Sequence, residues 1–468
     1  MRLISITGVL LLLTASAGLG SATPGSHVTT HWRATVATLP ANAASGANQL
    51  VSLSSISCAS PGNCSAVGWY IDSGGYQQGL LLTEHAGHWT RGVEAGVPAD
   101  AGTDPQVNLI AVSCASPGNC TAVGTYEDRK TGYSDVATSG LLLTETAGRW
   151  APGIEAALPA NVNQDPGVTL ESVSCASAGN CTAVGRYNPY PYQSSEGLLL
   201  TERAGHWARG VAYGGTDADL VSVSCAADGR CGAVGFANQH QGDRNGGPGG
   251  QNVLLLTKKK GKWRNESWKF QWPDGGPGEY AGLASVSCAT GGYCGVIGFD
   301  NIAIDRAGDG EGALFTRKAG KWLGVRADPP KQARSPYWGS YVALAGISCP
   351  SPGDCVAAGT YYGRRGRAHL TLLTQAAGKW QRGVEASLPR SVSPDATAIS
   401  CSSPGNCAVA GLGFVLVEIG GHLSRGAVAP HFPGSVDSVV SVSCTSPTSC
   451  GAVGDDGTSG VLLDFAAQ

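Results

Sequence analysis

Residues 109–124 of the chain read L-I-A-V-S-C-A-S-P-G-N-C-T-A-V-G, and residues 140–150 read G-L-L-L-T-E-T-A-G-R-W. The same frame recurs eight times along the sequence, each time around two cysteines separated by five residues. Successive pairs start between 43 residues apart (Cys401 to Cys444) and 63 residues apart (Cys225 to Cys288). Repetition at such a period indicates a fold built from one supersecondary unit used many times.

Each repeat reads as four short strands joined by turns. Ser-Pro-Gly-Asn supplies turn chemistry after the first strand, and Ala-Gly supplies it before the Trp. The run Leu141-Leu142-Leu143 is apolar on both faces, which suits a strand packed between two neighbouring sheets. No helical periodicity persists through a repeat, which excludes a helical solenoid. The sequence therefore predicts an all-β fold, a β-propeller of eight four-stranded blades.

The two ends of the chain complement each other. The last repeat ends at its third strand, V-L-L-D-F at residues 461–465, and no Trp strand follows. H-W-R at residues 31–33 and L-P at residues 39–40 match H-W-T at residues 88–90 and V-P at residues 97–98. We therefore predict that residues 31–40 form the outer strand of the last blade, so that the N-terminal strand closes the ring.

The N-terminus predicts export. Residues 1–22 combine a basic start, a short apolar run and a small-residue exit, the pattern of a signal peptide cleaved near Ala22. Residues 23–468 then form a single propeller domain, and no later segment approaches the length of a membrane span. We expect a secreted, extracellular protein that is a monomer.

The cysteine spacing predicts disulfides. An even number of cysteines in a secreted chain, at hairpin spacing, favours bonds within each C-x5-C pair. The alternative is zinc, but structural zinc prefers C-x2-4-C and four converging ligands, which pairs on eight separate blades do not supply. The predicted bonds are Cys58–Cys64, Cys114–Cys120, Cys175–Cys181, Cys225–Cys231, Cys288–Cys294, Cys349–Cys355, Cys401–Cys407 and Cys444–Cys450.

Composition and motifs restrict the function. A formal net charge of −3 argues against nucleic acid or an anionic membrane as the main partner. The sequence contains no G-x-S-x-G elbow, H-E-x-x-H helix or Walker loop.

The repeat resembles several known propeller repeats. The G-x-W turn resembles the Asp-box hairpin of sialidase-like propellers, although T-E-H-A-G-H-W at residues 83–89 lacks the Asp. It is also similar to the Trp-docking repeat of quinone-dependent dehydrogenases, which are eight-bladed. The frame S-x-S-C-x-S-x-G-x-C-x-A-V-G with L-L-x-T-E-x-x-G-x-W resembles repeats of secreted actinobacterial proteins over residues 30–465. The resemblance implies the fold, and it implies no activity.

The repeat also serves as an internal control, because a residue type that recurs in every blade is explained by common packing. The outer-strand tryptophans and Tyr70, Tyr126, Tyr187 and Tyr361 are interpreted as packing residues on this ground. The basic residue before each Trp is interpreted as a solvated position, and Lys258-Lys259-Lys260 as edge-strand protection. Glu94 and Glu385 are interpreted as surface pairs of Arg91 and Arg382.

The residues that break the repeat are the candidates for binding. They lie in long connections that a propeller places on the face opposite the C-x5-C turns, and such loops on a rigid scaffold commonly carry binding sites. Aromatic rings with Arg and His suit sugar stacking or peptide recognition. The predicted ligand-binding residues are His240, Trp268, Trp272, Tyr280, Tyr337, Trp338, Tyr362, Arg364, Arg365 and Arg367, with His369 beside them.

The favoured function is a non-enzymatic binding or scaffold module for an extracellular polysaccharide or protein. The alternative is a glycan-active hydrolase or lyase in which Glu279, Asp300, Asp305 or Asp309 faces the central channel. A quinone-dependent oxidoreductase is the third alternative. No cofactor is expected. The alternative is a calcium ion bound by Asp300, Asp305, Asp309 and Glu311. These residues do not follow the D-x-D-x-D-G pattern of a calcium-binding loop.

We predict that all sixteen cysteines are oxidised within their own C-x5-C pair. The invariant spacing in an exported chain gives each cysteine a partner on the adjacent strand of the same hairpin. Mass spectrometry of the non-reduced, alkylated and digested protein should find eight intrablade bonds. Free thiols or bonds between blades would contradict the prediction.

Overall fold

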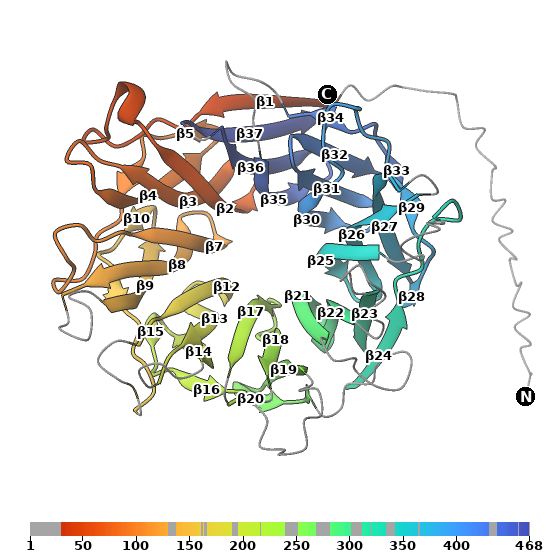
Figure 1. Cartoon of the computed structure of the whole chain (residues 1–468), viewed down its shortest axis with the longest axis horizontal. Helices are drawn as coiled ribbons and strands as arrows, with labels where there is room; N and C mark the ends of the chain where they lie inside the picture. The colour runs from red at the N-terminus through yellow and green to blue at the C-terminus, as the bar shows by residue number, and fades with distance from the viewer. Residues whose placement is uncertain are drawn as a thin grey trace, which may run out of the picture.

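The computed structural model describes residues 30–129, 137–160, 162, 166–189, 195–215, 217–238, 251–267, 281–300, 311–318, 320–333, 342–363, 366–429, 438–456 and 458–467. These residues form eight antiparallel sheets arranged in a ring around a central axis (Figure 1). The eight-bladed propeller predicted from the repeat is confirmed. In the described part of the chain, no helix is long and apolar enough to cross a membrane.

Each blade runs from the axis outward in chain order. The first strands of blades 1 to 8 are β2 (Val51–Ser60), β7 (Asn108–Ser116), β12 (Thr169–Ser177), β17 (Ala218–Cys225), β21 (Ala281–Ala289), β25 (Val342–Ser351), β30 (Ala396–Ser403) and β35 (Ser438–Ser446). The second strands are β3 (Asn63–Ile71), β8 (Asn119–Asp128), β13 (Asn180–Tyr187), β18 (Cys231–Asn238), β22 (Tyr293–Asp300), β26 (Asp354–Tyr362), β31 (Asn406–Gly411) and β36 (Ser449–Asp455). The third strands are β4 (Gln77–His85), β9 (Ala137–Thr146), β14 (Glu196–Arg203), β19 (Gln251–Lys259), β23 (Glu311–Lys318), β27 (Ala368–Ala376), β32 (Phe414–Ile419) and β37 (Gly460–Ala467).

The fourth strand is continuous in three blades and divided in five. The continuous strands are β20 (Lys262–Asn265), β24 (Lys321–Arg326) and β1 (Thr30–Val36), in blades 4, 5 and 8. The divided ones are β5 (His88–Trp89) with β6 (Val93–Glu94), β10 (Arg149–Trp150) with β11 (Ile154–Glu155), β15 (His206–Trp207) with β16 (Val211–Tyr213), β28 (Lys379–Trp380) with β29 (Val384–Glu385), and β33 (His422–Leu423) with β34 (Ala427–Val428). At the break a glycine amide turns to the preceding blade, as Gly153 does when its N–H donates to the carbonyl of Gly96 at 2.8 Å.

The N-terminal strand completes the last blade, as predicted. Strand β1 pairs antiparallel with β37, and Trp32 lies opposite Phe465 in the register (Figure 1). The observed strand ends at Val36, earlier than the predicted residue 40, because the amide of Ala37 makes the last bond to this blade, to the carbonyl of Gly460 at 2.9 Å. The signal peptide predicted for residues 1–22 lies outside the described residues.

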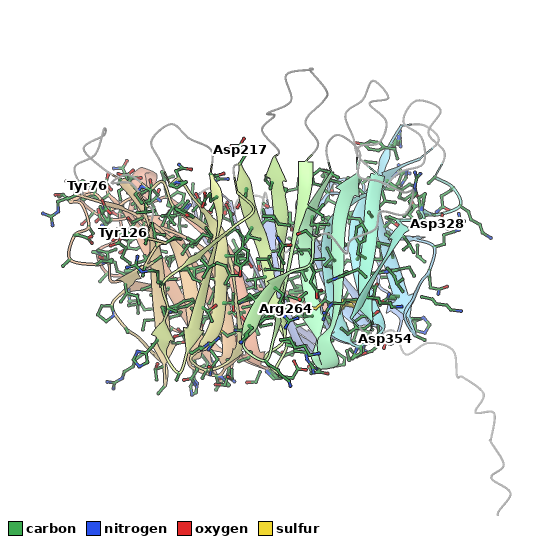
Figure 2. All side chains as sticks on the ribbon, turned by 90° about the horizontal axis from the view of Figure 1, so that it is seen from below. Tyr76, Tyr126, Asp217, Arg264, Asp328 and Asp354 are labelled. Atoms are coloured by element: carbon green, nitrogen blue, oxygen red, sulfur yellow. A yellow bond between two sulfur atoms is a disulfide. The ribbon has the colours of Figure 1, made fainter. Side chains whose placement is uncertain are left out.

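The two ends of the ring differ in construction. One end, here called the stapled face, carries the turns between first and second strands and the G-x-W turns between third and fourth strands. The two kinds of turn are hydrogen-bonded to each other, as when the amide of Gly148 donates to the carbonyl of Gly118 at 2.9 Å. The other end, here called the loop face, carries the remaining connections. Figure 2 shows Asp354 near the stapled face and Tyr76 and Asp217 near the loop face.

All eight disulfides form within their own C-x5-C pair and lie beside the turns of the stapled face. No cysteine in the chain is free. The bonds predicted from the spacing are therefore present in the structure.

A closed ring of hydrogen bonds joins the first strands around the axis. The serine before each first cysteine accepts the amide N–H of the equivalent cysteine in the next blade, at 2.9 or 3.0 Å. The eight bonds are Cys58 to Ser443, Cys114 to Ser57, Cys175 to Ser113, Cys225 to Ser174, Cys288 to Ser224, Cys349 to Ser287, Cys401 to Ser348 and Cys444 to Ser400. The ring gives a physical reason for the repeated S-C pair.

The apolar core is divided among the joints between blades. Each of eight buried clusters contains residues of two consecutive blades, such as Val67 and Leu81 of blade 1 with Leu109 and Leu141 of blade 2. The outer-strand residue of the second blade packs against each cluster, Trp150 in this example and Leu423 in the joint between blades 6 and 7. The interpretation of these tryptophans as packing residues is confirmed.

Removal of residues 23–40 should lower the melting temperature of the mature protein by several degrees. The deletion takes away β1, exposes the edge of β37 and removes Trp32 from the joint between blades 7 and 8. Differential scanning calorimetry of the deletion and of the full mature chain measures the difference. An unchanged melting temperature would show that β1 does not hold the ring closed.

Candidate functional site

Most of the predicted ligand-binding residues lie outside the described residues. These are His240, Trp268, Trp272, Tyr280, Tyr337, Trp338, Arg364 and Arg365. Of the carboxylates named for a hydrolase or for calcium, Glu279, Asp305 and Asp309 also lie outside. The backbones of Asp300 and Glu311 are paired at the end of β22 and β23. The loop-face site therefore stays a prediction.

Tyr362, Arg367 and His369 are described, and they share one hairpin at the loop face. Strand β26 ends at half-buried Tyr362, which pairs with Ala368 of β27. Arg367 is exposed, and its carbonyl accepts the amide of Gly363 at 2.9 Å. His369 stacks on Tyr361 with 5.3 Å between ring centroids and contacts Glu385 through Nδ1 at 2.9 Å. The hairpin is thus held by a contact network at its base.

The repeated tyrosines are buried, and their hydroxyls reach acidic side chains. Tyr70 donates to Glu94 at 2.8 Å, and Tyr361 donates to Glu385 at 2.7 Å. The interpretation of these glutamates as partners of Arg91 and Arg382 is wrong. Arg91 donates to the carbonyl of Leu39 at 3.0 Å, and Arg382 pairs with Asp328 at 2.8 Å. A buried hydroxyl needs an acceptor, which explains why Tyr and an acid recur together.

A second repeated position carries buried acids inside the joints. It follows the Thr of the third strand, where Glu145 accepts hydrogen bonds from the hydroxyls of Thr83 and Ser65 in the preceding blade, each at 3.4 Å. Glu202 and Glu418 occupy the same position in blades 3 and 7 and are also buried. Burial raises the pKa of each of these three carboxyls. These acids serve as packing groups inside the joints.

The closing joint, between blades 8 and 1, brings two acids together. Glu84 occupies the buried position in blade 1, and Asp464 of β37 stands where the preceding blade otherwise has a threonine. Gly451 replaces the residue equivalent to Ser65, so both hydroxyl donors are lost from this joint. Burial, together with the charge of Asp464, raises the pKa of Glu84 to about 7. Burial also raises the pKa of Asp464.

Blades 4 and 5 depart from this pattern, because a base replaces the buried acid. Lys258 lies over the ring of Trp263, with Nζ 5.8 Å from the ring centroid. Arg317 pairs with buried Glu266 at 3.2 Å, and Glu266 also accepts the indole N–H of Trp322 at 3.3 Å. Lysine and arginine in place of glutamate give this sector of the stapled face additional positive charge.

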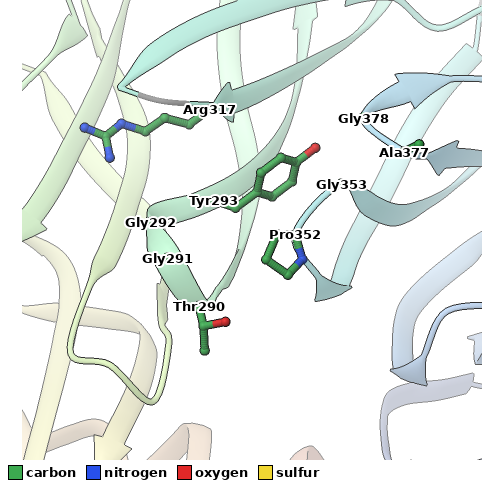
Figure 3. A pocket seen from close by; sticks show the side chains of 9 residues that line it. All are labelled: Thr290, Gly291, Gly292, Tyr293, Arg317, Pro352, Gly353, Ala377 and Gly378. Atoms are coloured by element: carbon green, nitrogen blue, oxygen red, sulfur yellow. The ribbon is translucent and has the colours of Figure 1, made fainter. Parts of the chain in front are cut away.

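A pocket of about 380 Å³ lies on the stapled face between blades 5 and 6. We call it the slot; it is lined by Thr290, Gly291, Gly292, Tyr293, Arg317, Pro352, Gly353, Ala377 and Gly378. Figure 3 shows the ring of Tyr293 amid this lining with Pro352 beside it, and the guanidinium of Arg317 directed away from the ring. Its lining therefore combines an aromatic ring, small apolar groups and backbone.

Tyr293 creates the slot by breaking the repeat. Blades 1, 2, 3 and 7 have Asn at this position, and its side chain bonds within the turn, as Asn63 does to Ser60 at 3.0 Å. The Tyr293 ring instead enters the joint, where its hydroxyl donates to Gln375 at 2.5 Å. Burial raises the pKa of this hydroxyl. The ring itself is also buried, with 7% of the residue exposed, so it packs in the joint and forms part of the wall of the slot.

The slot is suited to recognition rather than to acid–base chemistry. Its lining includes no carboxylate, histidine or serine. In the described residues, no group of three or more His, Cys, Asp or Glu side chains is placed to hold a metal ion. The sequence analysis missed the slot; its signal was the replacement of S-P-G-N by T-G-G-Y in blade 5.

The similarities to known proteins concern the fold alone. The sequence matches no protein-family profile and no curated protein. Among solved structures it is similar to YCF48 bound to D1 peptide, at 12% identity and a TM-score of 0.42 over 78% of this chain and 95% of that one. It is also similar to a polysaccharide lyase of family PL25, an ulvan lyase, at 10% identity and a TM-score of 0.43 over 90% and 96%. A third is virginiamycin B lyase from Staphylococcus aureus, at 8% identity and a TM-score of 0.42 over 94% and 100%.

We predict that the protein becomes less stable as the pH rises from about 5 to 8. The folded state holds a proton at Glu84 up to a pKa of about 7, whereas the unfolded chain loses it near the ordinary value of 4.5. The stability that this proton provides is complete below the unfolded pKa and is lost as the pH rises through the folded pKa. At pH 8 the loss at this residue is on the order of 3 kcal/mol. Thermal unfolding at a series of pH values measures the trend.

The variant E84Q isolates the closing joint. Blade 6 has Gln375 at the equivalent position, where its amide donates to Thr316 at 2.9 Å, so the substitution fits the fold. E84Q should raise the melting temperature at pH 8 and leave it nearly unchanged at pH 5. The control E127Q changes a half-buried acid near the loop face. An equal effect of both variants at pH 8 would contradict the assignment.

Proposed function

We propose that this protein is a secreted, non-enzymatic binding propeller that recognises an extracellular polysaccharide or protein. The main support is that the buried ionisable groups of the protein take part in the contacts that hold the blades together. The buried acids, such as Glu145, accept hydrogen bonds inside the joints between blades. The tyrosine hydroxyls of blades 1 and 6 donate to Glu94 and Glu385. A propeller built in this way is a rigid frame that presents surfaces.

The chemistry of the slot supports the same proposal. A glycosidase needs two carboxyl groups about 5–9.5 Å apart at the reacting bond, and the slot contributes a tyrosine ring, a proline and small residues instead. A lining of this kind can hold a ligand, but it supplies no carboxylate to cleave one. The eight intrablade disulfides support the extracellular location, since such bonds persist in oxidising compartments.

A binding screen with a product assay tests this function. The purified mature protein, residues 23–468, is applied to an array of microbial and plant polysaccharides and to a peptide library. Every polysaccharide that is bound is then incubated with the protein and analysed for shortened or unsaturated products. Binding without products is the expected result, and product release from a bound polysaccharide would refute the non-enzymatic function.

We further propose that the main ligand binds the loop face in blades 4 to 6. Simultaneous substitution W272A, W338A and R365A should weaken that binding at least about tenfold, because aromatic and arginine anchors commonly contribute about 2 kcal/mol or more each. The melting temperature should change little. The control is the pair H88A and R149A at G-x-W turns, where both side chains are exposed. Normal binding by the triple variant together with loss in the control would move the site to the stapled face.

A further inference from the structure

A Lys, Arg or His recurs at the same position of every blade, beside the turns of the stapled face. It stands between the Gly and the Trp of the third hairpin, or at the equivalent place where the Gly or the Trp is replaced. The eight residues are His31, His88, Arg149, His206, Lys262, Lys321, Lys379 and His422. Pseudo-symmetry places them at equivalent points around the ring, since each one begins or lies in the fourth strand of its blade.

Packing does not explain this recurrence. The seven residues of this set whose side chains are described are all exposed. Within the described part of the chain, none of those seven side chains makes a hydrogen bond or an ion pair. The neighbouring Trp and Glu positions recur because they fill the joints. Four of the eight are Lys or Arg, and a fixed charge that recurs on the surface without a partner among the described residues indicates a role outside the packing of the blades.

Additional cations concentrate the charge on blades 3 to 5. Exposed Arg203 reaches blade 4, where it donates to the carbonyl of Gly261 at 2.5 Å, beside exposed Lys259 and Lys260. Arg230 of the next turn lies against Gly292, a residue that lines the slot. Together with Lys262 and Lys321 these side chains form a basic arc that ends at the slot.

Acids are nearly absent from the same surface. Among the described residues of the stapled-face turns, the acids are Asp228 and Asp354. Asp228 pairs with Arg230 at 2.9 Å, and Asp354 accepts the hydroxyl of Ser351 at 2.7 Å. The net charge of −3 is therefore compatible with a cationic stapled face, and acids such as Asp217 and Asp328 lie toward the loop face (Figure 2).

We propose that the stapled face is a binding surface for an acidic polysaccharide, one that carries uronate or sulfate groups. The cations of the arc contact the acidic groups, and the slot at the end of the arc receives one sugar unit of the chain. Exposed Lys262, Lys321 and Lys379 stand at the same position in three successive blades, and this repetition matches a polymer with a regular anionic repeat better than the irregular surface of an acidic protein. The surface is separate from the loop face, and the inference rests on the proposed function for the extracellular location and for polysaccharide as a ligand class.

Direct binding measurements test the proposal. The mature protein is titrated by calorimetry with polygalacturonate and dextran sulfate at moderate salt, with neutral dextran and poly-L-glutamate as comparison polymers. One or both acidic polysaccharides should bind, more tightly than poly-L-glutamate, and neutral dextran should not. Absence of binding to both acidic polysaccharides overturns the proposal. Equal or tighter binding of poly-L-glutamate also overturns it and points to an acidic protein.

Charge reversal locates the surface. K321E with K379E changes two exposed lysines of the hairpins on either side of the slot and should weaken binding at least about tenfold. K331E with R390E changes the net charge equally at exposed positions outside these hairpins and should alter binding less than about twofold. Equal losses in the two double variants would show diffuse attraction to the whole molecule and overturn the assigned surface.

Substitutions at Tyr293 test the slot. Y293N restores the residue that four other blades use at this turn and removes the ring, whereas Y293F keeps the ring and removes only the bond to Gln375. Y293N should weaken polysaccharide binding several-fold, and Y293F should bind like the wild type. Unchanged binding by Y293N, with the disulfides and melting temperature intact, overturns the role of the slot. The loop-face variant W272A, W338A and R365A should bind these polymers normally, which separates failure here from failure of the loop-face site.

Discussion

The hydrogen bond from each first cysteine to the serine of the preceding blade is the contact on which the ring depends. An innermost strand has one edge with no strand beside it, and its amides would otherwise need another acceptor. The serine hydroxyl of the preceding blade's first strand supplies that acceptor at eight joints. The last of these bonds runs from Cys58 to Ser443 and joins the two ends of the chain. Since every blade both donates and accepts, the set is complete only in a closed ring. The disulfide beside each donor fixes the hairpin that presents it.

The sequence predicted the parts of the fold that repetition makes visible. A spacing used eight times identified the blade, the disulfides and the missing fourth strand that residues near Trp32 supply. Roles that depend on a neighbouring blade were not visible, because the partners are about a whole repeat apart in the chain. Glu94 was assigned to nearby Arg91, whereas it accepts the hydroxyl of Tyr70 in the same blade and the side-chain amide of Asn42, 52 residues earlier in the chain. The facing acids Glu84 and Asp464 were invisible for the same reason, since they come from opposite ends of the chain.

The candidate site was harder to predict, because loop length and composition drew attention to the loop face. The slot arises in a short turn where Tyr293 replaces the common Asn, a single change inside an otherwise regular unit. The repeat works well as a control at buried positions, where recurrence means packing. At exposed positions recurrence alone does not identify the role of a residue, and the contacts of the recurring side chain have to be considered as well. Lys262, Lys321 and Lys379 are exposed and have no partner among the described residues, so packing between blades does not account for their recurrence.

The two ends of the ring are suited to different kinds of recognition. A single exposed charge contributes at most about 1 kcal/mol to a contact, so one basic residue of the stapled face binds little by itself. The turns that carry these residues are fixed by disulfides and by bonds such as Gly148 to Gly118, so binding orders little additional backbone. Several weak contacts on a rigid frame act as linked sites, and the second contact of a polymer forms at high effective concentration after the first. Affinity at this face therefore depends on how many blades one polymer chain spans, whereas a site made of unrepeated loops binds a single ligand once.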